Sequence, residues 1–240
     1  FSPAVNFVFG GRNVNVSVRY DRIDVDYDTL IDSSQNGFQA KLGSRLGAKS
    51  SLNFDFSMFR REFEEDPSEF VTDYDGYRFG VGFDRQLTPR VAIRAFGGYE
   101  ERKFDEQGTT SRDFDSGVYS VDVMGEFPNA FALTGSVSRR LNDLASSGVY
   151  VVDRFNLELR KSFADRVSTN FNFFYQKSDN DQIPEEFNYI GLRIGGEYLM
   201  AKFLNVFLGY EYLDRETKVG TPPDFTENRF NFGLSASFGL

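Results

Sequence analysis

The sequence alternates between apolar and polar side chains with a period of two along nearly all of its length. From 167 to 176, one face carries Val, Thr, Phe, Phe and Tyr, and the other carries Ser, Asn, Asn, Phe and Gln. The same split recurs at 154–160, 204–212 and 77–84. Successive side chains of a β-strand point to opposite faces, whereas a helix repeats every 3.6 residues. The pattern therefore predicts a chain built almost entirely of two-faced strands.

Turn sequences divide these strands into antiparallel hairpins. Short turns are expected at 10–13, 48–50, 88–90, 128–130, 164–166 and 201–202. Longer polar loops are expected at 21–36, 62–75, 101–116, 142–149, 177–187 and 213–229, always opposite the short turns. Short turns at one end and long loops at the other are typical of bacterial outer-membrane barrels.

We expect thirteen strands, at 4–10, 13–22, 37–47, 51–61, 76–87, 90–102, 115–127, 130–141, 150–163, 166–177, 187–200, 203–213 and 229–240. The predicted fold is all-β: an antiparallel up-and-down transmembrane β-barrel with about 12–14 strands, in which 1–240 form a single barrel domain. Bacterial single-chain barrels have an even number of strands. We therefore expect that at least one N-terminal strand and the signal peptide are missing, so that this is the C-terminal portion of a longer chain. Alternatively, residues 1–10 lie outside the wall and twelve strands form the barrel.

A soluble sandwich or lipocalin-like barrel would also alternate. Soluble strands are usually five or six residues long, whereas tilted membrane strands need about 9 to 11. The strands here have ten or more residues, with tyrosines toward the long-loop end of the apolar face and phenylalanines toward the short-turn end. Both features favour the membrane barrel. The side chains expected to face lipid include Leu157, Leu159, Phe171, Phe173, Val206 and Leu208.

The last strand carries a more specific signal. Its sequence, Asn231-Phe-Gly-Leu-Ser-Ala-Ser-Phe238, resembles the C-terminal β-signal of bacterial outer-membrane proteins. The matching positions are Asn231, Gly233, Ala236 and Phe238, although Ala236 is small and two residues follow Phe238. The resemblance implies recognition by the barrel-assembly machinery.

The overall pattern resembles a family of proteobacterial outer-membrane proteins called putative β-barrel porin 2, which is often encoded with exopolysaccharide genes. The residues that carry this resemblance are Gly-Tyr-Glu at the strand ends 98–100 and 209–211, and the sequence at 229–238. The resemblance implies a pore or an accessory to polysaccharide export, located in the bacterial outer membrane. Its partners would be envelope or polysaccharide-export proteins.

Composition removes most enzyme classes. The chain has no His and no Cys, so it lacks the commonest general base, the usual zinc ligands and every Ser-His or Cys-His pair. We expect no catalytic activity and no cofactor. The net charge of −9 argues against nucleic-acid binding, which needs a basic surface.

The acidic residues are concentrated in the expected long loops. Five of these loops, all except 142–149, hold 25 of the 36 acidic residues but only 8 of the 27 Lys and Arg. These loops are either solvated or bind divalent cations that bridge to anionic lipopolysaccharide. Lipopolysaccharide and outer-membrane lipid are therefore expected partners. No spacing matches an EF-hand, so no metal-binding residue is named.

The polar faces of the strands carry charges of both signs. The bases expected there are Arg19, Lys41, Arg45, Arg61, Arg78, Arg94, Arg102, Arg140, Arg154, Arg160 and Arg193. The acids are Asp21, Asp55, Asp84, Glu100, Asp122, Glu126, Glu158, Glu197 and Glu211. Two interpretations stay open: a network of paired charges along the wall, or a charged constriction that selects a solute.

The leading functional hypothesis is a pore for passive diffusion or polysaccharide export through a charged lumen. The alternative is a structural or anchoring barrel that is plugged, or that works only within an envelope complex. The sequence does not separate these two, because occlusion depends on loops that fold inward.

Overall fold

The computed structural model describes residues 4–11, 13–25, 32–63, 73–105, 113–144, 148–163, 166–180, 184–201, 203–220 and 223–236. Thirteen strands form one sheet in sequence order, and every neighbouring pair is antiparallel. They are β1 (Ala4–Gly10), β2 (Val14–Val25), β3 (Ser33–Arg45), β4 (Ser50–Phe63), β5 (Tyr74–Thr88), β6 (Val91–Phe104), β7 (Phe114–Phe127), β8 (Phe131–Leu144), β9 (Gly148–Phe163), β10 (Val167–Asn180), β11 (Glu185–Ala201), β12 (Leu204–Val219) and β13 (Phe225–Ala236). No helix among the described residues is long and apolar enough to cross a bilayer.

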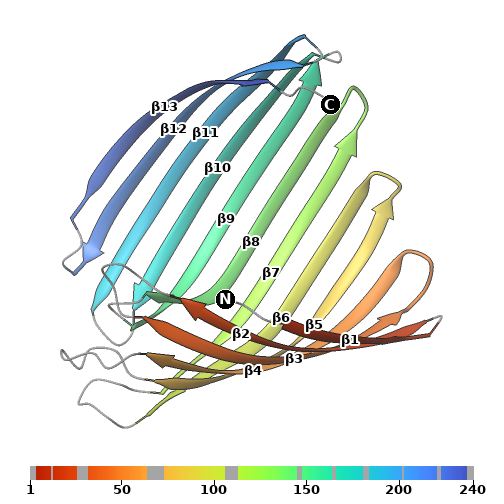
Figure 1. The fold of residues 1–240 in the computed structure, drawn as a ribbon, viewed down its shortest axis with the longest axis vertical. Coiled ribbons are helices and arrows are strands. Elements are labelled where there is room, and N and C mark those ends of the chain that lie inside the picture. Colours follow the sequence, from red (N-terminus) through yellow and green to blue (C-terminus); the bar gives the residue numbers. More distant parts are fainter. Residues whose placement is uncertain are drawn as a thin grey trace.

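The sheet curls strongly, with short turns along one end and the longer connections along the other (Figure 1). In the strand order, β1 neighbours only β2, and β13 neighbours only β12. The expected all-β, antiparallel, up-and-down architecture is confirmed. The alternative in which residues 1–10 lie outside the wall is wrong for Ala4–Gly10, because all seven of these residues pair with β2.

Several strands extend further toward the long-loop end than the sequence predicts. β12 runs to Val219 instead of 213, and β13 begins at Phe225 instead of 229. There, Asp214 pairs with Thr226, whose hydroxyl donates to the Asp214 carboxylate over 2.7 Å. A β-ladder is held by backbone hydrogen bonds, so it continues beyond the point where the apolar alternation stops. Alternation alone therefore underestimates the strand length.

The strand register separates an apolar face from a polar face. Phe171 lies opposite Leu159 of β9 and Ile194 of β11, whereas its neighbour Asn172 lies opposite Glu158 and Arg193. The six side chains expected to face lipid all lie on the apolar face, and Leu208 on this face is 63% exposed. A large, continuous and exposed apolar surface marks a membrane or protein contact. This arrangement does not fit a soluble core.

The pairing between β7 and β8 stops before the outer end of β8. β7 and β8 pair from Phe127–Phe131 only as far as Tyr119–Arg139, although β7 begins at Phe114 and β8 ends at Leu144. Beyond the break, Nη2 of Arg102 on β6 donates to the Leu141 carbonyl over 3.3 Å. Because β7 lies between β6 and β8 in the sheet, this hydrogen bond spans β7. The outer end of β8 therefore turns inward, across the polar face of β6 and β7, instead of continuing the wall.

Candidate functional site: the polar face of the sheet

The register places all twenty charged residues expected on the polar face on that one face of the sheet. Many of them form ion pairs along or across strands. The pairs are Arg19–Asp21 (3.4 Å), Lys41–Asp55 (3.6 Å), Arg94–Asp84 (3.4 Å), Arg102–Glu100 (2.8 Å), Arg160–Glu158 (2.5 Å) and Arg193–Glu211 (2.6 Å). Except for the buried pair Arg102–Glu100, these pairs are exposed to solvent, and such pairs contribute little to stability. Their main effect is to neutralise charge along the wall.

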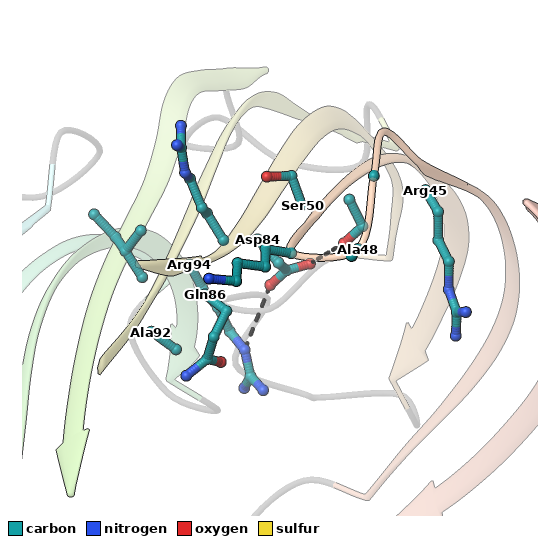
Figure 2. A pocket seen from close by; sticks show the side chains of 12 residues that line it. Arg45, Ala48, Ser50, Asp84, Gln86, Ala92 and Arg94 are labelled. Atoms are coloured by element: carbon teal, nitrogen blue, oxygen red, sulfur yellow. Dashed lines mark hydrogen bonds and ion pairs between the residues drawn. The ribbon is translucent and has the colours of Figure 1, made fainter. Parts of the chain in front are cut away.

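One group of paired residues lies in a hollow of about 730 Å³ at the short-turn end, between the β3–β4 and β5–β6 turns (Figure 2). Asp84 is its centre. The Asp84 carboxylate receives hydrogen bonds from Ser51 (3.3 Å) and Asn53 (2.7 Å), and it forms the ion pair with Arg94. The Asp84 carboxylate is thus satisfied, whereas the lining also carries Arg45, Lys49 and Arg85, so the hollow has a net positive charge.

Other charged residues of the polar face have no such partner. Within the described ranges, no ion pair within 4.0 Å involves Arg45, Arg78, Arg140, Arg154, Asp122, Glu126 or Glu197. Four of these seven residues are arginines. The structure therefore supports a paired network for part of the set and leaves an excess of unpaired positive charge.

Two of the unpaired arginines lie on aromatic rings. The guanidinium carbon of Arg154 is 4.7 Å from the centre of the Phe174 ring, and that of Arg78 is 4.7 Å from the Phe96 ring. Phe174 in turn covers Gly191, where an added Cβ would lie 2.1 Å from a ring carbon. The missing side chain lets the ring lie against the wall. Each of these two arginines is thus stacked on an aromatic ring. At Arg154, the absence of a side chain at Gly191 determines where that ring lies.

The inward-turned end of β8 covers a buried cluster. Beneath it, Arg102 and Glu100 are 4% and 5% exposed, and the Arg102 guanidinium lies 5.5 Å from the centre of the Tyr74 ring. Phe114 packs with Leu141 of β8 and Val149 of β9. By strand alternation, Leu141 belongs to the apolar face and Phe114 to the polar face. Their contact therefore requires the inward turn.

A second set of contacts holds the outer end of β9 from the other side. Tyr150 packs against Phe187 of β11 with ring centres 5.5 Å apart, and its hydroxyl donates to the Glu185 carboxylate. Tyr150 and Val152 are each only 2% exposed. The outer end of the β8–β9 hairpin is thus packed against β6 and β7 on one side and against β11 on the other, and it occupies space over the polar face.

The alternation of the sequence does not reveal this inward turn, because it predicts a β8 that lies wholly in the wall and a polar loop at 142–149. A signal is nevertheless present, because residues 149–152 are Val-Tyr-Val-Val, four apolar residues in a row. A continuous apolar run indicates a strand covered on both faces.

The residues of the β-signal occupy the last strand. Asn231 and Gly233 lie on the polar face of β13, Gly233 beneath the ring of Phe207, and Ala236 is the last residue of the strand. Phe238 and most of the acidic loop 62–75 lie outside the described residues. Within the described part of the chain, no three acidic side chains are grouped as a metal site.

A curled antiparallel sheet with one apolar and one polar face, short turns at one end and long connections at the other, defines the class of bacterial outer-membrane β-barrels. The family model described as "Putative beta-barrel porin 2" matches residues 31–238. The chain belongs to this family, and its location is the bacterial outer membrane. No curated protein matches it.

Solved structures with a similar fold are also outer-membrane proteins. The copper transporter OprC is 10% identical, with a TM-score of 0.68 over 99% of this chain and 51% of its own. The FrpB iron transporter of Neisseria meningitidis is 10% identical, with a TM-score of 0.64 over 92% of this chain and 45% of its own. The channel DcaP of Acinetobacter baumannii is 12% identical, with a TM-score of 0.56 over 99% and 84%. The chain thus spans about half the length of the two transporters.

Proposed function

We propose that the protein is an outer-membrane pore through which small polar solutes diffuse passively along the polar face of the sheet. The observation that carries this proposal is the continuity of that face, on which all twenty expected charged residues lie. Membership of a porin family supports a channel rather than an enzyme. Export of a polysaccharide would need a wide opening, and the inward-turned hairpin end reduces the space over the polar face. We therefore favour small solutes.

The test is the single-channel conductance of the full-length protein in planar lipid bilayers. We expect discrete, voltage-independent conductance steps in KCl. Addition of long dextran chains should leave the conductance unchanged if only small solutes enter. A current that the chains block would instead favour the polysaccharide route.

A structural or plugged barrel is the second candidate. It is favoured by one observation, the packing of the outer end of β8 and β9 against both β6–β7 and β11. A wild-type protein that inserts into the bilayer but never conducts would support it. A variant in which a short Asn-Gly turn replaces residues 140–150 would then be expected to conduct.

A further inference from the structure

Arg140 and Arg154 lie next to each other on the polar face, at the point where β8 separates from β7. Arg154 pairs with Ser138 in the register of β8 and β9, and Arg140 is two residues further along β8. Diagonal neighbours of this kind on one face are about 7–8 Å apart, within reach of long side chains. The two guanidinium groups therefore face a common volume.

These two arginines lack the partner that similar arginines on the same face have. Arg160, also on β9, lies 2.5 Å from Glu158, and Arg193 lies 2.6 Å from Glu211. Neither Arg140 nor Arg154 takes part in an ion pair within 4.0 Å among the described residues. Two adjacent like charges without a counter-charge repel each other, so an anion that binds between them relieves this repulsion.

Two carboxylates at the outer end of the sheet are engaged by other partners. Glu100 accepts hydrogen bonds from Nε and Nη2 of Arg102, over 3.1 and 2.8 Å. Glu185 accepts the hydrogen bond from the Tyr150 hydroxyl. Both acids are thus held by their own partners, and the positive charge of the arginine pair is left for a ligand.

The Arg154 side chain is also positioned before any ligand arrives. Its guanidinium lies over the Phe174 ring, which itself occupies the space beside Gly191 that a side chain would need. A guanidinium is planar and presents its N–H donors in a fixed fork that matches carboxylate and phosphate oxygens. Arg140 is exposed, and Ser136 and Ser138 on β8 are small. The site therefore combines one fixed donor group and one adaptable donor group beside small neighbouring side chains.

We propose that Arg140 and Arg154 form an anion-binding site for small oxyanions, such as the phosphate or carboxylate group of a solute. The site lies at the base of the inward-turned end of the β8–β9 hairpin, where β8 separates from β7. Its role in selecting solutes rests on the proposed pore function. Binding itself requires only the folded protein.

Inorganic phosphate is the probe, and binding to the full-length protein in detergent micelles is followed by the broadening of its ³¹P resonance. The double variant Arg140→Gln/Arg154→Gln is compared with Arg160→Gln/Arg193→Gln, which removes the same charge from the same face. We expect saturable binding to the wild type, at least tenfold weaker binding to the first variant, and less than a twofold change in the second. Equal weakening in both variants, or no saturable binding to the wild type, overturns the proposal.

A third variant keeps the test decisive if the double variant does not fold. Arg154→Lys retains the charge but loses the planar fork, so we expect phosphate binding to weaken at least threefold, and unchanged affinity contradicts the site. Single-channel recording separates this proposal from the pore. A wild type that binds phosphate without conducting overturns the pore alone, whereas a conducting wild type without saturable phosphate binding overturns the site alone.

Discussion

At the residue scale, glycines on the polar face decide where the aromatic rings lie. Added Cβ atoms at Gly191 and Gly233 would lie 2.1 and 2.0 Å from carbons of Phe174 and Phe207, so each ring occupies the space that a side chain would need. At Phe174, the ring placed in this way also lies under the Arg154 guanidinium. These glycines are required by close approach and not by an unusual backbone angle.

The first prediction concerns Gly191→Ala. The new methyl group forces Phe174 from its position, and such overpacking costs about 1–3 kcal/mol of unfolding free energy. The measurement is urea-induced unfolding in lipid vesicles. Gly135→Ala is the matched control, because a Cβ there meets nothing within 4 Å. Equal stability of the two variants would show that the Phe174 ring is free to move.

The face of each of these residues could be predicted from the sequence, but its contacts could not. Alternation puts Arg154, Phe174 and Gly191 on one face, since each occupies a known position in a period of two. Which ring covers which glycine depends on the register between neighbouring strands. A single sequence does not specify that register. The sequence therefore predicts these arginines as wall residues but does not predict the rings on which they stack.

At the scale of elements, β8 departs from the prediction. Its inner part alternates and pairs with β7, whereas its outer part leaves β7 at Tyr119–Arg139 and crosses the polar face. Tyr119 lies on the apolar face of β7, toward the end of the sheet where tyrosines are expected at the membrane interface. Above the interface, unpaired backbone groups can bond to water, so the strands can separate without the cost that lipid imposes. The apolar run at 149–152 indicates a hairpin end that is covered on both faces, but the period of two does not give the direction in which β8 turns.

The second prediction tests the inward turn by cross-linking. The sequence contains no Cys, so a disulfide can form only between the two cysteines that are introduced. In a continuous wall, positions 114 and 141 would lie on opposite faces. In the observed structure Phe114 and Leu141 are in contact, and we expect Phe114→Cys/Leu141→Cys to form a disulfide on mild oxidation.

The control pair for this experiment is Val121→Cys/Val137→Cys, whose positions are direct partners in the paired part of β7 and β8. Both pairs should oxidise, which is read from the mobility of the unreduced protein on a denaturing gel. Oxidation of the control pair alone would mean that the outer end of β8 follows the wall.

At the scale of the whole molecule, the register makes the assignment of faces all-or-none, because a slip of one residue exchanges the two faces. The third prediction uses neighbouring residues of β10. Phe171→Arg places a charge on the lipid face and should cost about 2–4 kcal/mol near the bilayer centre. Asn170→Arg, on the exposed polar face, should be nearly neutral. Urea unfolding in vesicles compares them, and a reversed order would exchange the two faces.

The last prediction concerns how charge segregation over the whole molecule affects ion selectivity. The expected long loops are rich in acids, whereas the polar face carries four arginines outside the ion pairs of the described residues. Loop charges act on a permeating ion only through solution, so their effect falls as the Debye length shrinks from about 10 Å at 0.1 M salt to about 3 Å at 1 M. Replacing Glu64, Glu65 and Asp66 by their amides should shift the reversal potential toward anions at 0.1 M KCl and leave it unchanged at 1 M. The recording at 1 M is the internal control, and a shift of equal size at both concentrations would place these acids inside the conducting path.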